Sequence, residues 1–450
     1  MTAKRPRTND PAQDIYFVSL GCPKNRVDTE VMVGLALRAG FGIAADPAEA
    51  DIIVVNTCAF IGDAREESVN ALLEMAQYKA TGRCHTLVAA GCLSQRSAAE
   101  LRAAMPELDA LIGTVNPDEI VRAIQQPRRL SHLSQPGHFL PSAATPRFLS
   151  PGQVSAYVKI ADGCSRRCAF CAIPGIRGKQ GSRSVADIVS EVRQLGERGI
   201  REVVLVSQDT AAYGRDRRDG TDLCALLSAL DAVDTVDWIR PMYLYPTEVS
   251  SALLATMARA QRILPYLDIP IQHAAPGVLK AMRRGHQPEA LHQMLRRIRR
   301  HLPHAWLRTT VLVGHPGETD ADIDALIAFM QEARFDHLGA FRYSPEADTA
   351  ACDMPGQVRP VDSYRRWRKV MAAQRRIAAA QKRQRKGQVV PVLIEGLGDD
   401  DGFVLEGRCI GQAPEIDGVT WVLSCQAPPG SIVQGRIVRA DAYNFVVEPV

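Results

Sequence analysis

Short apolar runs alternate with stretches of helical spacing from residue 15 onward. The first three apolar runs lie at 15–20, 51–57 and 86–91, and helical patterns follow at 28–37, at 64–79 and after Cys92. Buried strands that alternate with helices form parallel sheets covered by helices on both faces. We therefore predict an α/β domain with a doubly wound parallel sheet over residues 12–126.

The same alternation returns after residues 125–151, which are rich in Pro, Ser, His and Arg and which we interpret as a linker. Six strand patterns follow at 154–160, 203–206, 238–243, 266–270, 307–313 and 337–343. Six strand–helix units predict a partial (β/α)6 TIM-like barrel over residues 150–382, with its chemistry at the carboxyl ends of the strands.

The pattern changes again from residue 388. Short strands separated by Gly, Asp and Pro lie at 389–395, 403–407, 419–423, 431–440 and 444–448. They predict a small antiparallel β-barrel over residues 383–450. From residue 388 to 450 there are nine acids, among them Asp399, Asp400 and Asp401, against three bases. Nucleic-acid barrels need a positive groove, so a basic protein is the better partner for this one.

Residues 359–386 form a strongly basic helical stretch, with eleven Lys and Arg against the single acid Asp362. Trp367, Val370 and Met371 give it an apolar stripe. Two interpretations stay open. The stretch is either a packed connector with a solvated face or a surface for RNA phosphates.

The composition places the chain among ordinary globular proteins. Its net charge is +4 over 450 residues, so any attraction to nucleic acid must come from local patches. No apolar run is long enough to span a membrane, and Lys4, Arg5 and Arg7 precede no apolar segment of a signal peptide. Eleven cysteines fit a reducing cytoplasm and metal or redox use, so we expect a cytoplasmic protein without a membrane partner.

Cys164, Cys168 and Cys171 place three thiols within eight residues. Thiolates select zinc or iron–sulfur clusters. A closed zinc site needs four ligands, and no Cys or His lies within the thirty residues after Cys171. This favours a 4Fe-4S cluster with three protein thiolates and one iron free for a small molecule, with zinc as the alternative.

A second group of cysteines shares one position. Cys22, Cys58 and Cys92 each lie just past the carboxyl end of a predicted strand. These ends line the ligand crevice of such sheets, so the three thiols are expected to converge. Taken singly, each cysteine also fits a small buried hydrophobe.

Polar residues follow the strands of the predicted central barrel. They are Ser207, Gln208, Asp209, Tyr245, Gln272, His273, Gly314, Gly317, Glu318, Tyr343, Ser344 and Glu346. As a ring they predict a cofactor and substrate pocket. Taken by itself, His273 is also consistent with a structural histidine whose hydrogen bonds are satisfied within the protein. The turn from Gly314 to Glu318 allows close backbone approach to a ligand, or is an ordinary loop.

The cysteine loop, with Phe170 before its last cysteine, resembles the radical S-adenosylmethionine enzymes. With the other cysteine triad ahead of it and a small barrel behind it, the chain from about residue 15 to 450 resembles the methylthiotransferases of that family. The resemblance implies an auxiliary 4Fe-4S cluster on Cys22, Cys58 and Cys92. It implies a radical-generating cluster on Cys164, Cys168 and Cys171, and a terminal TRAM domain. The S-adenosylmethionine pocket would include Phe170, Ser207, Gln208, Gly314 and Glu318. No side chain is assigned as catalytic, because the chemistry would lie at the clusters.

Two stretches resemble the branch of the family that acts on a ribosomal protein. They are Asp-Ile-Pro-Ile-Gln-His-Ala at 268–274 and Tyr-Ser-Pro-Glu at 343–346. The implied reaction is methylthiolation of the β-carbon of an aspartate in small-subunit ribosomal protein S12, free or in the 30S subunit. Its implied electron donor is flavodoxin or ferredoxin, and we expect a monomer. A tRNA adenosine 2-methylthiotransferase and a zinc-bearing ribosome-binding protein are the alternatives.

Overall fold

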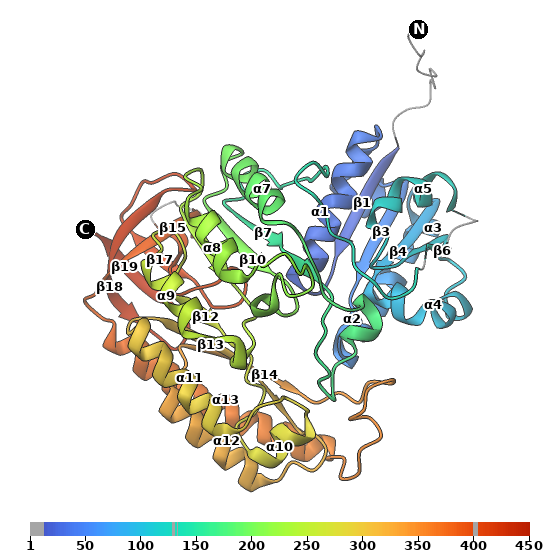
Figure 1. The fold of residues 1–450 in the computed structure, drawn as a ribbon. Helices are drawn as coiled ribbons and strands as arrows, with labels where there is room; N and C mark the ends of the chain where they lie inside the picture. The colour runs from blue at the N-terminus through green and yellow to red at the C-terminus, as the bar shows by residue number, and fades with distance from the viewer. Residues whose placement is uncertain (1–12, 128–130, 133, 399–403) are drawn as a thin grey trace. The chain divides into compact units, whose positions relative to one another are not determined.

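A six-stranded parallel sheet forms the centre of the first of two units in the computed structural model (Figure 1). This unit extends to Phe139 and includes Thr145–Leu149 and Gly175–Arg177, and the second unit takes the rest of the chain. The structure describes residues 13–127, 131–132, 134–398 and 404–450. The basic residues Lys4, Arg5 and Arg7 and the acids Asp399, Asp400 and Asp401 lie outside the described residues.

The strand order of this sheet is β2-β1-β3-β4-β5-β6, and each neighbouring pair is parallel. The strands are β1 Asp14–Ser19, β2 Gly42–Ile43, β3 Ile52–Thr57, β4 Thr86–Gly91, β5 Ala110–Ile112 and β6 Ser131–His132. The chain builds outward from β1 in both directions, which creates a topological switch point between β1 and β3. The predicted doubly wound parallel sheet is confirmed.

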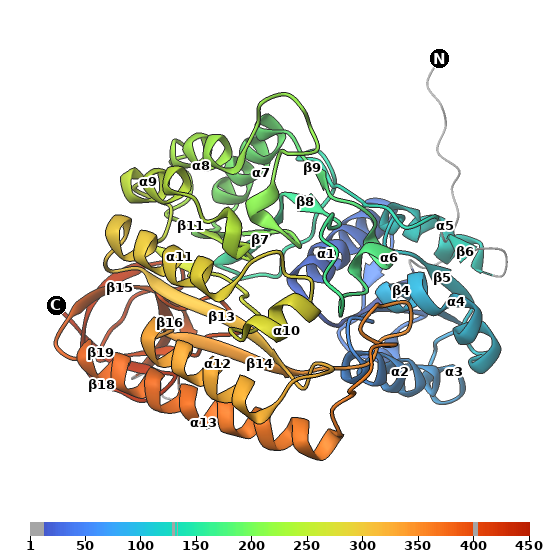
Figure 2. The same cartoon turned by 60° about the horizontal axis from the view of Figure 1, so that its bottom comes forward.

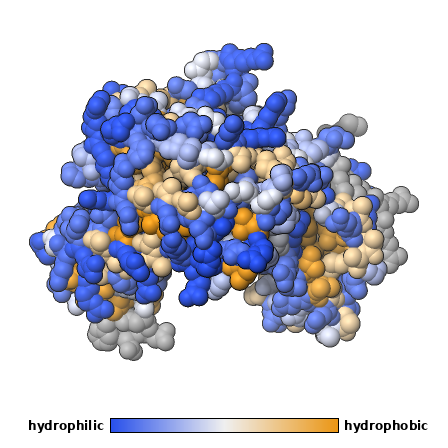
Figure 3. Space-filling model, turned by 90° about the horizontal axis from the view of Figure 1, so that it is seen from below, coloured by the Kyte–Doolittle hydropathy of each residue, from blue (hydrophilic) through white to orange (hydrophobic). Residues whose placement is uncertain are grey.

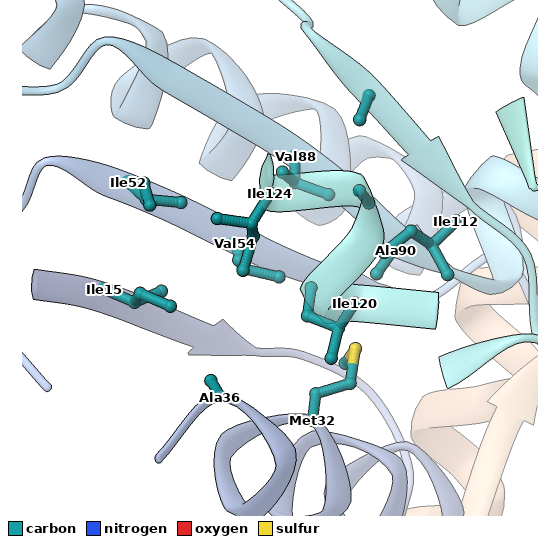
Figure 4. Close-up of a cluster of buried hydrophobic side chains, with 12 residues drawn as sticks. Ile15, Met32, Ala36, Ile52, Val54, Val88, Ala90, Ile112, Ile120 and Ile124 are labelled. Atoms are coloured by element: carbon teal, nitrogen blue, oxygen red, sulfur yellow. The ribbon is translucent and has the colours of Figure 1, made fainter. Parts of the chain in front are cut away.

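Helices follow the strands as the sequence pattern requires. They are α1 Pro23–Arg38, α2 Gly62–Ala76, α3 Tyr78–Thr81, α4 Cys92–Ala104 and α5 Ile120–Gln125. Figure 4 shows Met32 and Ala36 of α1 and Ile120 and Ile124 of α5 packed against apolar side chains of the sheet. Strand β3 is buried along its whole length, as expected for a central parallel strand.

The sequence pattern missed several boundaries in this unit. Helix α1 begins at Pro23, five residues before the predicted start. Proline is well suited to the first position of a helix, but the residues from 23 to 27 do not show the apolar spacing on which the prediction relied. The short strands β2, β5 and β6 were not predicted, since two or three residues show no period. Strand β6 lies within residues 125–151, so that stretch is not only a linker.

Six parallel strands form the centre of the second unit. They are β7 Ser155–Lys159, β10 Glu202–Val206, β11 Trp238–Pro241, β12 Tyr266–Asp268, β13 Trp306–Val313 and β14 His337–Arg342. They form two three-stranded sheets, β11-β10-β7 and β12-β13-β14. The sheets are linked by a parallel bridge between Ile239 and Ile263 and by a hydrogen bond from the Leu244 N–H to the Asp268 carbonyl. This is the predicted open barrel.

The helices of this unit are α7 Val185–Glu197, α8 Leu223–Asp231, α9 Ser251–Arg259, α10 Pro276–Ala281, α11 Pro288–His301, α12 Asp320–Ala333 and α13 Pro360–Gln384, and α6 Ile173–Arg177 begins in this unit and ends in the first. Side-chain caps fix several of their starts. Ser184 begins α7 by accepting from the Asp187 N–H, and Thr319 and Asp322 form a capping box on α12. A two-stranded ladder of β8 Ala161–Asp162 and β9 Gly181–Ser182 lies beside the cysteine loop in sequence.

Helix α13 runs along α12 and β14 and leads to a closed barrel (Figure 2). The barrel strands are β15 Val389–Leu397, β16 Val404–Cys409, β17 Thr420–Leu423, β18 Ile432–Ala440 and β19 Phe445–Pro449, in the order β15-β16-β17-β19-β18. The predicted small barrel is confirmed, but β17 and β19 are parallel. Five strands cannot alternate in direction all the way around a closed ring, so one neighbouring pair must be parallel.

Hydrophilic side chains cover most of the face drawn in Figure 3, with smaller apolar areas between them. Exposed large apolar residues include Phe341, Val361 and Tyr364. Within the described part of the chain, no helix combines the length and apolarity needed to cross a membrane.

Candidate functional site: two groups of cysteine thiols

The first group of thiols lies at the carboxyl edge of the six-stranded sheet, next to its switch point. Cys22 precedes the first residue of α1, Cys58 directly follows β3, and Cys92 is the first residue of α4. The strand register pairs Ser19 with Asn56 and Thr57 with Gly91, so the three strand ends are level. The structure thus brings together the cysteines that the sequence singled out. Two of them lie at helix N-termini, which favour negative charge.

The loops after β1 and β3 are held together around Cys58. The Asn25 Nδ2 donates to the carbonyls of Leu20 and Thr57, over 3.2 and 2.8 Å. Gly21 has a φ of +86°, and a Cβ there would lie 2.7 Å from the Cys58 Cβ and 2.9 Å from its Sγ. Only glycine allows both the backbone conformation and this approach.

We expect Gly21→Ala to displace Cys58 and to lower both the stability and the iron content of the reconstituted protein. A non-glycine residue at positive φ costs on the order of 1 kcal/mol or more, and the clash adds to this. Thermal unfolding and an iron assay measure the two effects. The matched control is Gly40→Ala, which has a φ of +95° but no atom within 4 Å of the added Cβ. It should lose stability and keep its iron. Equal iron in the two variants would contradict the assigned role of the close approach.

A buried arginine compensates charge at this group. Arg177 is 1% exposed, and its Nη2 donates to the Asn25 Oδ1, to Asp28 over 3.2 Å and to the Cys92 Sγ over 3.6 Å. Burial raises the pKa of Cys22, but the charges of Lys24 and Arg177 outweigh it, and the pKa ends below its usual range. Burial, with the neighbouring Cys92 and Cys22, raises the pKa of Cys58 to about 12.

These features fit an anionic iron–sulfur cluster. The donor set consists of thiols, which such clusters require, and both the guanidinium and the helix N-termini offset negative charge.

The second group of thiols lies in the loop between β8 and α6, in the second unit. The Cys164 N–H donates to the Gly178 carbonyl over 3.0 Å, and the Cys171 N–H donates to the Cys168 carbonyl over 3.2 Å. Burial raises the pKa of Cys164 to about 11 and that of Cys171 to about 12, and the charge of Cys168 adds to both shifts. All three cysteines are partly exposed, so a ligand can reach their thiols.

Charged and aromatic side chains surround this loop. Arg166, between the first two cysteines, pairs with Asp209 over 2.7 Å and with Glu248 over 2.8 Å. Its guanidinium lies 3.9 Å from the centre of the Tyr245 ring, and that of Arg284 lies 4.3 Å from the same ring. The loop is therefore anchored to residues that follow β10 and β11.

Three predicted pocket residues lie near the cysteine loop or follow β10. Ser207 is fully buried, and its Oγ lies 3.1 Å from the Thr210 Oγ1. The Gln208 Nε2 donates to the Asp162 Oδ1 over 2.7 Å, while its Oε1 is buried without a hydrogen bond. Phe170 packs on an apolar cluster that contains Met282 and Leu312. One polar side and one apolar side are thus present for a ligand.

The other two predicted pocket residues form the turn after β13. The Gly314 N–H donates to both carboxylate oxygens of Glu318 over 2.9 Å, and Glu318 pairs with Arg366 over 3.1 Å. A Cβ on Gly314 would lie 2.4 Å from the Ser363 Oγ of α13. The close approach at Gly314 is therefore with this helix. Contact of either residue with a cofactor stays a prediction.

Buried polar atoms without hydrogen bonds lie at the same strand ends. Besides the Gln208 Oε1, they include the Asp209 Oδ1 and the His273 Nε2, which lies 3.6 Å from Glu318. Native structures seldom leave such atoms unsatisfied, so they fit a polar ligand such as S-adenosylmethionine. Among the described residues, no three or more His, Cys, Asp or Glu are placed to hold a single metal ion.

Sequence reasoning missed the two arginines that contact cysteine sulfurs. Arg177 and Arg284 are 1% and 4% exposed. In the sequence each is one basic residue among 54. Only their burial distinguishes them, and no periodic signal reports it.

Several basic residues of the stretch 359–386 pair with acids of the second unit. Arg365 and Arg366 contact Asp320, and Arg385 contacts Asp336 over 3.1 Å. Lys382 is fully buried. These contacts favour the connector interpretation, while Arg368, Arg375, Arg376 and Arg383 are exposed. RNA contact through these four stays a prediction.

The acidic character of the terminal barrel is weaker in the described residues than in the sequence. Asp417 is buried and pairs with Arg308 over 2.7 Å, and Glu395 pairs with Arg408 over 2.8 Å. The exposed described acids are Glu415, Asp441 and Glu448. Asp399, Asp400 and Asp401, which entered the predicted acidic charge, lie outside the described residues.

Three family models match the chain in the order of its parts. They are the uncharacterized protein family UPF0004 over residues 14–113, the radical SAM superfamily over 158–330 and the TRAM domain over 387–450. With the two groups of thiols, they define a radical S-adenosylmethionine enzyme of multidomain type.

Curated relatives define the family more closely. A protein of Sorangium cellulosum (strain So ce56) is 44% identical over 97% of this chain and 91% of its own length. One of Syntrophus aciditrophicus (strain SB) is 44% identical over 97% of this chain and 98% of its own. Both are named ribosomal protein uS12 methylthiotransferase RimO. The chain belongs to this radical S-adenosylmethionine methylthiotransferase family.

A solved structure shows a related fold. The radical S-adenosylmethionine methyltransferase TsrM from Kitasatospora setae, with cobalamin and a [4Fe-4S] cluster bound, matches 76% of this chain and 77% of its own, with a TM-score of 0.56 and 13% identity.

Proposed function

We propose that this enzyme methylthiolates the β-carbon of an aspartate in small-subunit ribosomal protein S12 (uS12). The observation that carries the proposal is the presence of two separate groups of three cysteine thiols in one chain that resembles uS12 methylthiotransferases over 97% of its length. One group suffices to generate a radical, whereas inserting sulfur requires a second. We propose that the chain has three domains, at residues 12–126, 150–382 and 383–450.

Cys164, Cys168 and Cys171 would hold the radical-generating 4Fe-4S cluster, and Cys22, Cys58 and Cys92 the auxiliary one. When bound, these clusters and S-adenosylmethionine supply the electron transfer, the radical and the methylated sulfur. Three thiolates at each site would leave one iron of each cluster for a small molecule. Arg177 and the helix N-termini at Cys22 and Cys92 offset the negative charge of the auxiliary site.

The S-adenosylmethionine pocket would lie at the strand ends of the central barrel. Phe170 supplies an apolar wall, and the Gln208 Oε1 supplies a hydrogen-bond acceptor without an internal partner. Ser207 would fix the loop that carries Gln208, and Gly314 and Glu318 would fix the turn after β13. The buried residues Ser207, Gly314 and Glu318 would help to keep water from the reacting atoms.

Partners and location follow from the same assignment. The substrate is uS12, and the exposed arginines of α13 would contact the surrounding ribosomal RNA. We expect a cytoplasmic monomer that takes its electrons from a one-electron donor such as flavodoxin or ferredoxin.

The test compares two acceptors. The anaerobically reconstituted enzyme, S-adenosylmethionine and a reductant are incubated with uS12 and, separately, with tRNA. Mass spectrometry should find a methylthio group on an aspartate of uS12 and none on the tRNA. A Cys168→Ser enzyme should modify neither. Modification of tRNA alone would contradict the proposal and favour the adenosine 2-methylthiotransferase alternative. A colourless protein that holds zinc would contradict both.

A further inference from the structure

Arg284 makes a direct contact with a cysteine of the radical-generating group. It follows α10, is 4% exposed, and donates its Nη1 to the Cys168 Sγ over 3.3 Å. Its Nη2 donates to the Pro270 carbonyl over 2.6 Å, and its guanidinium lies over the face of the Tyr245 ring. The Nε is buried and makes no hydrogen bond. Packing thus fixes the guanidinium against one sulfur.

The charge of Arg284 lacks a protein counterion. Within the described parts of the chain, no carboxylate forms an ion pair with it. The other two arginines near the thiols differ in this respect. Arg166, on the same Tyr245 ring, pairs with Asp209 and Glu248, and Arg177 pairs with Asp28. A buried, unpaired guanidinium is costly, so its partner is expected to be an anion bound at the Cys168 side.

We propose that Arg284 is a positioning residue that raises the reduction potential of the cluster held by Cys164, Cys168 and Cys171. This inference rests on the proposed function, because it takes that cluster as the missing anion. Reduction adds one electron from an external one-electron donor, and no bond forms or breaks in this step. The cluster gains one negative charge. A fixed positive charge and a hydrogen bond to a ligating sulfur therefore stabilise the reduced form more than the oxidised form.

The consequence is a difference between the two cysteine groups. At the auxiliary group, Asp28 shares the charge of Arg177, so less of that charge acts on the Cys92 sulfur. At the radical group, the full charge of Arg284 acts on Cys168. Arg284 thereby eases the reduction that a cytoplasmic donor must perform at that cluster.

The experiment measures the potential directly. Full-length protein with Cys22, Cys58 and Cys92 replaced by Ala is reconstituted, so that only the radical cluster titrates, and is followed by electron paramagnetic resonance during a redox titration. Arg284→Met should lower the ratio of reduced to oxidised cluster about tenfold at a fixed potential, a midpoint about 59 mV more negative for one electron. The matched control is Arg283→Met, which removes the same charge from an exposed neighbour. It should change the ratio less than about twofold, because solvent screens it.

Each outcome decides the matter. An unchanged potential in an iron-loaded Arg284→Met protein would overturn the inference and leave the proposed function intact. Should that variant lose its cluster, Arg284→Gln, which keeps a donor for Cys168 but no charge, should hold the cluster at a lowered potential. An unchanged potential in Arg284→Gln, or loss of the cluster from both folded variants, would also overturn the inference. A parent protein that binds no cluster would instead refute the cysteine assignment of the proposed function.

Discussion

Replacing Cys22, Cys58 and Cys92 together by Ala is expected to remove about half of the iron and all methylthiolation of uS12, while cleavage of S-adenosylmethionine continues. The reason is that two clusters of equal iron content would be held by separate triads, in separate units of the structure. Iron is counted after anaerobic reconstitution, and cleavage and methylthiolation are measured on the same samples.

The matched control is Cys84→Ala, which removes a buried cysteine from the same unit. Cys84 is 4% exposed, and its Sγ donates to the Thr86 carbonyl rather than facing the triad. Its iron content should match that of the unmodified enzyme. Iron that is unchanged in the triple variant would show that these three cysteines hold no cluster.

Glu202→Gln is expected to destabilise the second unit by about 3–5 kcal/mol, because it leaves the buried Arg240 without its carboxylate partner and removes one of the two carboxylates that pair with Arg408. Glu202 of β10 is fully buried and accepts from the Arg240 Nε over 2.8 Å and from Arg408 of β16. Arg240 and Arg408 are themselves 0% and 2% exposed. This network joins the terminal barrel to the central strands. Urea unfolding followed by tryptophan fluorescence measures the loss.

The effect should depend on pH in a defined direction. Burial alone raises the pKa of Glu202, but the charges of Arg408 and Arg240 outweigh it and hold the pKa at about 2, below its ordinary value of 4.5. A lowered carboxyl pKa stabilises the fold above the ordinary value, and this stability is lost as the pH falls from 4.5 toward 2. The difference in free energy of unfolding between the unmodified protein and Glu202→Gln should therefore shrink as the pH falls from 4.5 toward 2.

An exposed carboxylate of the same unit supplies the control. Glu448→Gln should change the stability by less than about 0.5 kcal/mol, because Glu448 lies in solvent. A loss as small in Glu202→Gln as in Glu448→Gln would contradict the role of the buried network.

The sequence predicted the strands well where they are long and fully buried. The runs at 51–57 and 86–91 became β3 and β4 almost residue for residue, because central parallel strands need continuous apolar side chains. It failed where the local signal is weak or ambiguous, as at the two-residue β6. The parallel pair of β17 and β19 was also missed, since strand direction in a closed barrel follows from closure and not from any one strand.

For the site, the spacing of residues in the chain and their position after strands singled out six cysteines as candidate cluster ligands, and that assignment stays a prediction. It did not identify what surrounds them. The sequence predicted that a ligand comes close to the backbone at Gly314. In the structure, the side chain of Ser363, 49 residues further along the chain (363 − 314), lies next to Gly314. The same holds for the basic helix, because the sequence does not reveal which of its basic residues pair with acids such as Asp320 and Asp336.

By itself the sequence determined the ligand chemistry, since thiols, their spacing and their place after strands are properties of the chain. The tertiary structure decided which charges act on those thiols. Arg177 lies 85 residues from Cys92 in the chain, and Arg284 lies 116 residues from Cys168. Whether such arginines lie in solvent or beside a sulfur depends on packing between distant segments, and only burial gives their charge its strength, because water no longer screens it.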